Sequence, residues 1–264
     1  MNIFKRELKA NLRSLLIWGG ITIVFIFLAI TEFSGYAGNP EMLAILDSMP
    51  SALTSAFQMN AFNLTTITGF YGIMFTYFSL IVTISAAMWG SDIISKEERD
   101  KTVEFSLTLP ITRERLITGK ILAAMVNCIV LLLILWLASL VAVAQYEPDN
   151  EFYNFLALSV LSLFIIQMVF LSVGVFLGCS MKQYKRAGAV AVSVLLGAYF
   201  LSIISSMNEK LEFLRFLTPF QYFNPVSLLN ESSIDIGYLF LSLGIIAVLI
   251  FGGYYTYARR DLYI

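Results

Sequence analysis

The sequence lacks histidine and contains little charge. None of its 264 residues is histidine, and only 13% are Asp, Glu, Lys or Arg. The absence of histidine excludes Ser/His/Asp triads, Cys/His pairs and most zinc sites. A water-exposed surface needs roughly a quarter of its residues charged, whereas 58% of this chain is hydrophobic and its mean hydropathy is +0.80. The composition therefore excludes an ordinary soluble domain and indicates an integral membrane protein.

Cysteine is scarce, and a phosphate-binding loop is lacking. Cys128 and Cys179 are the two cysteines, and both fall in expected membrane spans, so we expect small apolar packing roles rather than a disulfide or a metal cluster. Gly119-Lys120 is followed by Ile121, where a phosphate loop needs Ser or Thr. We therefore expect no catalytic, metal or cofactor site on this chain. If ATP drives this protein, another chain must bind the ATP and its Mg.

Six uncharged runs are long enough to cross a membrane, which takes about 20 residues for a hydrocarbon core of about 30 Å. They cover residues 14–31, 70–90, 121–146, 152–181, 187–208 and 236–258. Their lack of Asp, Glu, Lys and Arg disfavours a proton- or ion-coupled transporter. The first run is longer than the core of a signal peptide, so we expect it to stay in the protein. We predict an all-α integral membrane protein with a single transmembrane domain over residues 1–264.

The positive charges lie mostly on one side of these spans. Fifteen of the seventeen Lys and Arg residues fall at the two termini, in segment 91–120 or in the loop after Met181, while the other loops carry ten of the acids. Because cytoplasmic loops retain positive charge, we predict that both termini are cytoplasmic. The net charge of −1 offers no unbalanced basic face for nucleic acid.

Residues 1–14 combine apolar and basic positions. Leucines and a phenylalanine recur at helical spacing, and basic residues occupy the other faces; the residues concerned are Phe4, Lys5, Arg6, Leu8, Lys9, Leu12 and Arg13. We expect an amphipathic helix lying on the inner membrane surface, with its cations attracted to anionic headgroups. The alternative is that these cations only flank the first span.

Segment 91–120 is strongly polar yet nearly neutral, with six basic and six acidic residues between Asp92 and Lys120. Residues 95–106 are compatible with a helix, which Pro110 ends. Thr112 can then cap a second helix that has Glu114 in its first turn and continues into the third span. We expect a helical elbow projecting into the cytoplasm. The alternative is a solvated loop with internal ion pairs.

The outer segment 207–235, before the last span, is rich in aromatic residues and interrupted by proline. The residues that define it are Phe213, Phe216, Pro219, Phe220, Tyr222, Phe223 and Pro225. It is too apolar for an exposed loop and too broken for a spanning helix. We expect two short helical pieces that enter the outer leaflet, which requires packing against protein or a cavity. An aromatic belt at the membrane interface is the alternative.

Small residues and amides mark contacts inside the spans. Gly174 and Gly178 form a GxxxG spacing, which predicts a close helix approach, either internal or between two chains. Asn127 and Gln167 are amides deep in spans. We expect them to form hydrogen bonds between helices, with substrate contacts as the alternative.

The polar segment 91–120 also carries a motif. Its positions are Glu97/Glu98, Thr102-Val103-Glu104, Leu107, Pro110-Ile111-Thr112-Arg113, Leu116 or Ile117, and Lys120. This pattern resembles the type-2 permease family of ATP-binding-cassette (ABC) transporters, in which it lies between spans two and three. Lys101 stands where the family usually has Gly, and Phe105-Ser106 replaces an apolar pair. The resemblance covers almost the whole chain, including the amphipathic start, the six spans and the aromatic-proline segment.

The resemblance implies a partner for the cytoplasmic side. The N-terminal helix and the first helix of segment 91–120 are expected to contact a separate nucleotide-binding ATPase subunit. The expected coupling residues are Glu97, Glu98, Arg99, Thr102, Glu104, Leu107, Pro110 and Arg113. The resemblance also implies two permeases per transporter, either two copies of this chain or this chain with a sister permease.

These inferences predict the permease subunit of an ABC exporter in the cell membrane. Its uncharged, aromatic-rich spans suit a hydrophobic or amphipathic substrate, such as a peptide or drug. The alternative is a non-transporting immunity or sensor protein that binds a toxic peptide, which would not co-purify with an ATPase. An intramembrane enzyme needs a nucleophile or metal centre that the sequence does not offer.

Overall fold

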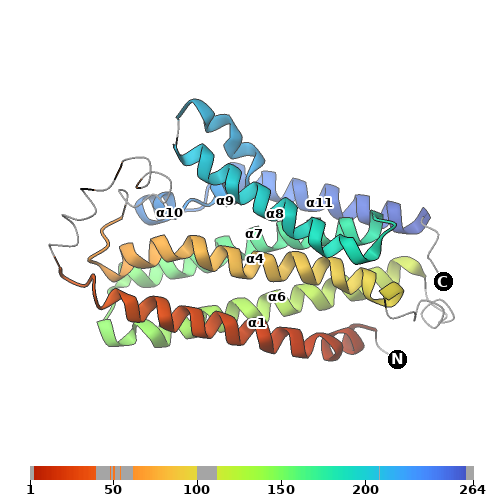
Figure 1. Ribbon diagram of the computed structural model, residues 1–264, viewed down its shortest axis with the longest axis horizontal. Helices are drawn as coiled ribbons and strands as arrows, with labels where there is room; N and C mark the ends of the chain where they lie inside the picture. The colour runs from red at the N-terminus through yellow and green to blue at the C-terminus, as the bar shows by residue number, and fades with distance from the viewer. Residues whose placement is uncertain are drawn as a thin grey trace.

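The computed structural model describes residues 3–39, 48, 50, 54, 62–99, 112–207 and 209–259. In this part of the chain six helices are long and apolar enough to cross a membrane, and no strand occurs (Figure 1). They are α1 (Ile3–Phe33), α4 (Ile67–Arg99), α6 (Arg113–Val143), α7 (Asn150–Ser180), α8 (Tyr184–Met207) and α11 (Ile236–Arg259). At about 1.5 Å per residue, each is longer than the hydrocarbon core of about 30 Å. The predicted all-α class with six spans is confirmed.

Short helical elements connect the spans. They are η2 (Ala144–Tyr146), η3 (Glu209–Leu217), α9 (Pro219–Tyr222) and α10 (Pro225–Glu231). Proline begins both α9 and α10, where its missing N–H costs no hydrogen bond. The side chain of Asn224 caps α10 by accepting from the backbone N–H of Val226 at 2.9 Å. In Figure 1, α9 and α10 lie toward the end of the bundle opposite the N-terminus.

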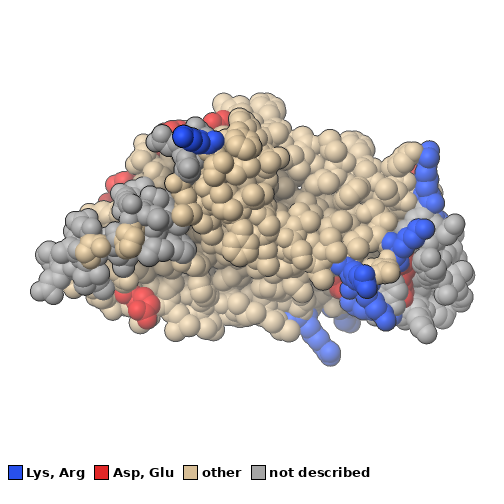
Figure 2. Space-filling view, turned by 45° about the horizontal axis from the view of Figure 1, so that its top comes forward, with Lys and Arg blue, Asp and Glu red and all other residues tan. Residues whose placement is uncertain are grey.

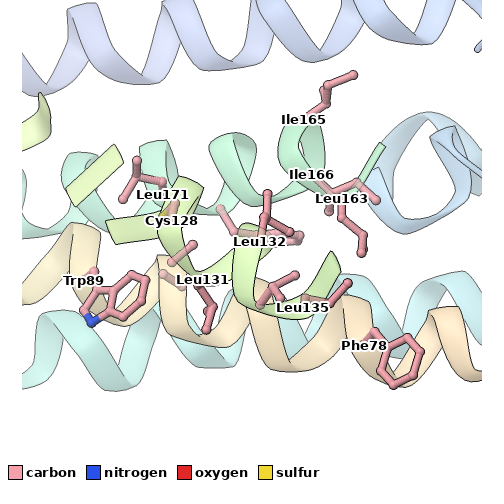
Figure 3. Packing of buried hydrophobic residues seen from close by; sticks show 14 of the residues in the cluster. Phe78, Trp89, Cys128, Leu131, Leu132, Leu135, Leu163, Ile165, Ile166 and Leu171 are labelled. Atoms are coloured by element: carbon pink, nitrogen blue, oxygen red, sulfur yellow. The ribbon is translucent and has the colours of Figure 1, made fainter. Parts of the chain in front are cut away.

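Helices α4 and α7 form the centre of the bundle. Helix α4 contacts α1, α6, α7 and α8, and α11 packs mainly against α7. Buried apolar side chains such as Phe78, Leu131 and Ile166 fill the space between the helices (Figure 3). Leu16 of α1 and Phe251 of α11, by contrast, are exposed on the outside. Such apolar outer faces suit contact with lipid rather than water.

Charged side chains are distributed unevenly along the bundle. Figure 2 shows most Lys and Arg side chains gathered at one end. We call it the basic end; it is formed by the first turns of α1, α6 and α8 and the last turns of α4, α7 and α11. The sidedness agrees with the charge pattern of the sequence, and the membrane orientation stays a prediction.

Candidate functional site

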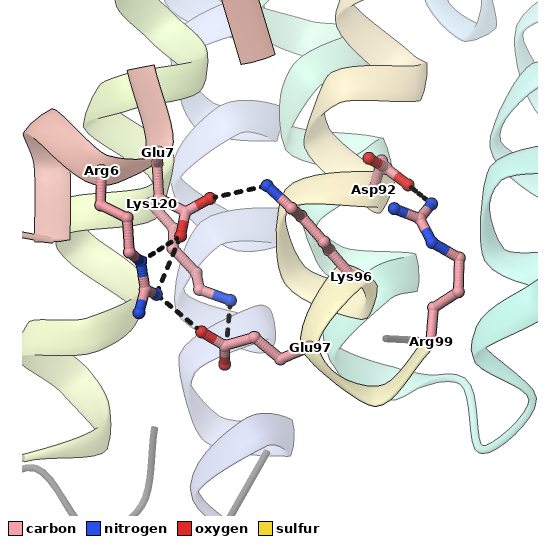
Figure 4. A network of polar contacts seen from close by, with 7 residues as sticks. All are labelled: Arg6, Glu7, Asp92, Lys96, Glu97, Arg99 and Lys120. Atoms are coloured by element: carbon pink, nitrogen blue, oxygen red, sulfur yellow. Dashed lines mark hydrogen bonds and ion pairs between the residues drawn. The ribbon is translucent and has the colours of Figure 1, made fainter. Parts of the chain in front are cut away.

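Three helices meet at the basic end around a group of charged side chains. Helix α1 supplies Arg6 and Glu7, α4 supplies Lys96 and Glu97, and α6 supplies Lys120 (Figure 4). Helix α4 ends at Arg99 and α6 begins at Arg113, so Glu97 and Lys120 flank segment 100–112 in the sequence. We call these five residues the ion-pair network.

Glu97 lies at the centre of the network. One of its carboxylate oxygens accepts from the Arg6 guanidinium at 2.9 Å, and the other lies 3.2 Å from the Lys120 ammonium. Arg6 also donates to Glu7 at 2.9 Å, and the second oxygen of Glu7 lies 3.6 Å from the ammonium of Lys96. All of these links except Arg6–Glu7 join two different helices. The network therefore connects α4 directly to both α1 and α6.

The network is largely withdrawn from solvent. Lys120 is 1% exposed, Glu7 3% and Glu97 7%. Charges withdrawn from water are tolerated only where opposite charges and hydrogen bonds compensate them. Glu98, the neighbour of Glu97, is also buried and adds a further carboxylate to this end of the bundle. The arrangement thus depends on all three helices being in place.

Lys120 is positioned by the buried face of α6. Ile117, Lys120 and Ala124 follow one another at spacings of three and four residues and are all buried, so the lysine occupies a core position of the helix. The helix begins as predicted, because the side chain of Thr112 accepts from the N–H of Arg115 at 3.3 Å. The motif predicted no internal role for Lys120, although a lysine on a buried helical stripe is the signal of a buried ion pair.

The predicted coupling residues fall into four groups. Glu97 and Glu98 are buried within this chain, and their predicted contact with an ATPase subunit stays a prediction. Arg99 is exposed and pairs with Asp92. Arg113 lies 3.4 Å and 3.5 Å from two carbonyl oxygens at the end of α11. The remaining predicted positions, and with them the elbow, lie outside the described residues: Thr102, Glu104, Leu107 and Pro110.

The N-terminal segment differs from its prediction. Residues 3–14 continue into the first span as one unbroken helix, α1, of 31 residues. Phe4 and Leu8 pack against the protein core, while Leu12 is exposed. A separate helix lying along the membrane surface needs a break before the span, and α1 has none. The apolar stripe is therefore explained partly by packing against the protein. Its basic residues other than Arg6 are exposed: Lys5, Lys9 and Arg13.

The aromatic-proline segment folds into η3, α9 and α10. Tyr222 and Phe223 are buried, and the Tyr222 ring stacks on Tyr238 of α11 with centroids 5.1 Å apart. Phe220 packs against other aromatic rings, and Pro219 and Pro225 are buried as well. Phe213 and Phe216 are exposed. The segment is thus part core and part outer surface, and its depth in the membrane stays a prediction.

Gly174 and Gly178 lie in an internal contact between α7 and α4. A Cβ atom on Gly174 would fall 2.3 Å from the carbonyl oxygen of Ala87, and one on Gly178 would fall 3.0 Å from that of Ser91. Gly90 of α4 faces α7 in the same way, because its Cβ would fall 2.4 Å from the carbonyl oxygen of Leu171. The backbones of the two central helices therefore touch.

The two deep amides behave differently. Gln167 of α7 donates to the carbonyl oxygen of Val82 in α4 at 3.2 Å, so its predicted bond between helices is confirmed. The amide nitrogen of Asn127 in α6 is buried and has no hydrogen-bond partner among the described residues. The predicted bond between helices is therefore wrong for this nitrogen.

The fold and the basic end define a class: a multi-pass helical membrane protein in which an ion-pair network joins the first three spans, and Glu97 and Lys120 of that network flank in the sequence the polar segment between the second and third spans. The family model described as ABC-2 family transporter protein matches residues 1–262, so the chain belongs to the ABC-2 transporter family. The resemblance to type-2 permeases inferred from the motif is thereby confirmed. No curated protein matches the chain.

Proposed function

We propose that this protein is the permease subunit of an ABC exporter that moves a hydrophobic or amphipathic substrate, peptide-like or drug-like, out of the cell. One observation carries the proposal beyond family membership: the buried ion-pair network joins α1, α4 and α6, and its residues Glu97 and Lys120 flank the polar segment 100–112 in the sequence. A force applied to that segment reaches three spans at once through this network.

The energy for transport comes from a separate cytosolic subunit that binds ATP and Mg and hydrolyses ATP. That subunit docks at the basic end, which faces the cytoplasm of the cell membrane. Segment 100–112, with Thr102, Glu104, Leu107 and Pro110, receives its movement, and Arg99 extends the contact surface. Glu97 acts inside the protein, where it passes the displacement from α4 to α1 and α6.

Two permeases, identical or sister chains, form the complete transporter. The central position of α4 explains how a local movement spreads, because α4 also contacts α7 and α8. The apolar character of the spans favours a cargo that partitions into the membrane over an ion or a sugar.

The test is purification of the tagged chain from its own cells in a mild detergent, followed by identification of co-purifying proteins. We expect an ATPase with a GxxxxGK[ST] loop. The complex in inside-out vesicles should take up a fluorescent amphiphilic dye in an ATP-dependent manner. Replacement Glu104→Arg, in the predicted contact segment, should lower retained ATPase severalfold, whereas Lys182→Glu, at an exposed residue of the same end, should not.

Two results decide against the proposal. If the chain purifies from its own cells with no ATPase, the subunit assignment fails and the immunity or sensor role takes its place. If the complex forms but Glu104→Arg leaves ATPase retention and dye uptake unchanged, segment 100–112 is not the contact.

A further inference from the structure

Helix α11 is the least buried of the six spans, and of its 24 residues only Ser242, Gly253 and Tyr257 are buried. It packs along α7, and it also contacts α6 and α9. In Figure 1 it runs from beside α9 to the basic end. A helix with so few buried contacts shifts against its neighbours more easily than the central helices do.

Two contacts join α11 to α6 at the basic end. The Thr118 hydroxyl donates its one proton to the carbonyl oxygen of Glu114 at 2.8 Å, so the Tyr254 hydroxyl donates to the Thr118 oxygen, at 2.6 Å. The guanidinium of Arg113 lies 3.4 Å and 3.5 Å from two carbonyl oxygens in the last turn of α11. Carbonyl groups there lack partners within the helix and carry partial negative charge, which a cation stabilises.

These contacts lie directly after the polar segment 100–112 in the sequence. Arg113 is the first residue of α6, and Thr118 follows in the second turn. A displacement of the segment that moves the start of α6 therefore acts on α11 as well. This route does not pass through the ion-pair network, to which α11 contributes no residue.

The other end of α11 contacts the aromatic-proline segment. Tyr238, in the first turn of α11, stacks on Tyr222 of α9 with centroids 5.1 Å apart and ring planes 9° apart. Its ring also lies 6.2 Å from that of Phe216 in η3. The Tyr222 hydroxyl donates to the carbonyl oxygen of Phe216 at 2.5 Å, which joins α9 to η3. Tyr238 thus contacts both parts of one connected unit.

We propose that α11 mechanically links the start of α6 to the aromatic-proline segment, so that a movement of segment 100–112 also moves the opposite end of the protein. Arg113, Thr118 and Tyr254 are the positioning residues at the basic end, and Tyr238 is the positioning residue at the other end. Tyr254 lies 16 positions after Tyr238, about 24 Å along the helix. The part of this inference that concerns ATP rests on the proposed transport function.

A fluorescent label on the aromatic-proline segment tests the α11 link. Phe213→Cys places a thiol at an exposed residue of η3 for an environment-sensitive fluorophore, whereas the native Cys128 and Cys179 are buried. In the complex purified with its ATPase, ATP and Mg should change the emission of the label. Tyr254→Phe, which removes only a hydroxyl group, should reduce this change and dye uptake severalfold. It should leave ATPase retention unchanged.

Matched replacements separate the link from general damage. Thr118→Val removes the same bond from the α6 side, so it should cause the same loss, and its combination with Tyr254→Phe should add nothing further. Tyr238→Ala should cause the loss from the other end, whereas Tyr238→Phe retains the stacked ring and the full response. Tyr255→Phe is the control, because Tyr255 is exposed and its hydroxyl makes no hydrogen bond within the described residues.

An undiminished response in Tyr254→Phe, or an equal loss in Tyr255→Phe, overturns the α11 link. A loss in Tyr238→Phe as large as in Tyr238→Ala also overturns it, because stacking is then not the contact that transmits the movement. Thermal unfolding confirms that each variant is folded. If Tyr238→Ala is unfolded, Tyr254→Phe and Thr118→Val decide the outcome.

Failure of the link and failure of the proposed function give different results. If dye uptake depends on ATP but the label does not respond to ATP, the link fails and the transport function stands. If no ATPase co-purifies, the proposed function fails, and the link is decided on the isolated chain. There Tyr254→Phe should still shift the emission of the label on η3, and an unchanged spectrum overturns the link.

Discussion

Lys120, at the end of the polar segment 91–120, is buried in an ion pair and is not exposed to solvent. An ammonium group that is 1% exposed has lost nearly all of its hydration, and Glu97 at 3.2 Å is its closest ion-pair partner in the network. Breaking a buried ion pair by removing one partner costs more than removing both, because the remaining charge is left uncompensated. The contribution of the network therefore lies mainly in fixing helix positions.

This asymmetry predicts opposite results for a single and a double replacement. Glu97→Gln should lower the free energy of unfolding by about 3 kcal/mol, because Lys120 and Arg6 then lose their shared carboxylate. Adding Lys120→Met removes the stranded ammonium and should restore most of that loss. Unfolding by sodium dodecyl sulfate titration measures both variants. An additive or larger loss in the double variant would show that the pair is not coupled.

The sequence predicted contacts between neighbouring residues better than contacts between residues that are far apart in the chain. Thr112 as a helix cap depends on neighbours within three residues, and it was found there. The link between Arg6 and Glu97 joins positions 91 residues apart, and sequence spacing carries no information on such a pair. The family resemblance predicted Glu97 and Glu98 as contacts to an ATPase subunit, and it gave no sign that tertiary packing buries both residues within this chain.

At the scale of helices, the contact between α4 and α7 holds the centre of the bundle together. Gly90 on α4 and Gly174 on α7 each face the backbone of the other helix. In lipid, helices associate through close packing and interhelical hydrogen bonds. Small residues at a contact therefore stabilise helix association more than added apolar surface does. The Gln167–Val82 hydrogen bond joins the same two helices.

Replacement of one central glycine tests this contact. Gly174→Ala should reduce the free energy of unfolding by about 1–3 kcal/mol, because the added Cβ meets the Ala87 carbonyl oxygen at 2.3 Å and forces the helices apart. Gly197→Ala in α8 is the control, since a Cβ there meets nothing within 4 Å. It should be neutral or stabilising by up to about 1 kcal/mol. Equal effects of the two replacements would mean that close approach is not what Gly174 provides.

Element boundaries were the less predictable part of the fold. Uncharged runs located all six spans, but helices α1 and α4 extend well beyond them into charged sequence. Such extensions are stable because charged side chains such as Glu7 and Lys96 pair with one another across helices. Sequence alone could not show that pairing, so residues 1–14 were separated from the first span. The contact between α4 and α7 was anticipated only as a close approach by Gly174 and Gly178, with its partner helix left open.

At the scale of the whole molecule, the separation of charge between the two ends of the bundle predicts its orientation in the membrane. The first turns of α1, α6 and α8 and the last turns of α4, α7 and α11 share one end, where the Lys and Arg side chains collect. The opposite end carries Glu32, Glu147 and Glu151. If positive loops stay in the cytoplasm, the basic end faces the ATPase subunit that the proposed function requires.

Cysteine labelling determines this orientation directly. The native Cys128 and Cys179 are fully buried, so a membrane-impermeant maleimide should not reach them in the folded protein. Glu151→Cys and Lys182→Cys each place a thiol at an exposed residue, at opposite ends of the bundle. In intact cells we expect labelling of Glu151→Cys alone, and labelling of Lys182→Cys only after the membrane is permeabilised, because the basic residues are retained inside during insertion. The reverse pattern would place the basic end outside, where no cytosolic ATPase could reach segment 100–112, and the proposed coupling would fail with it.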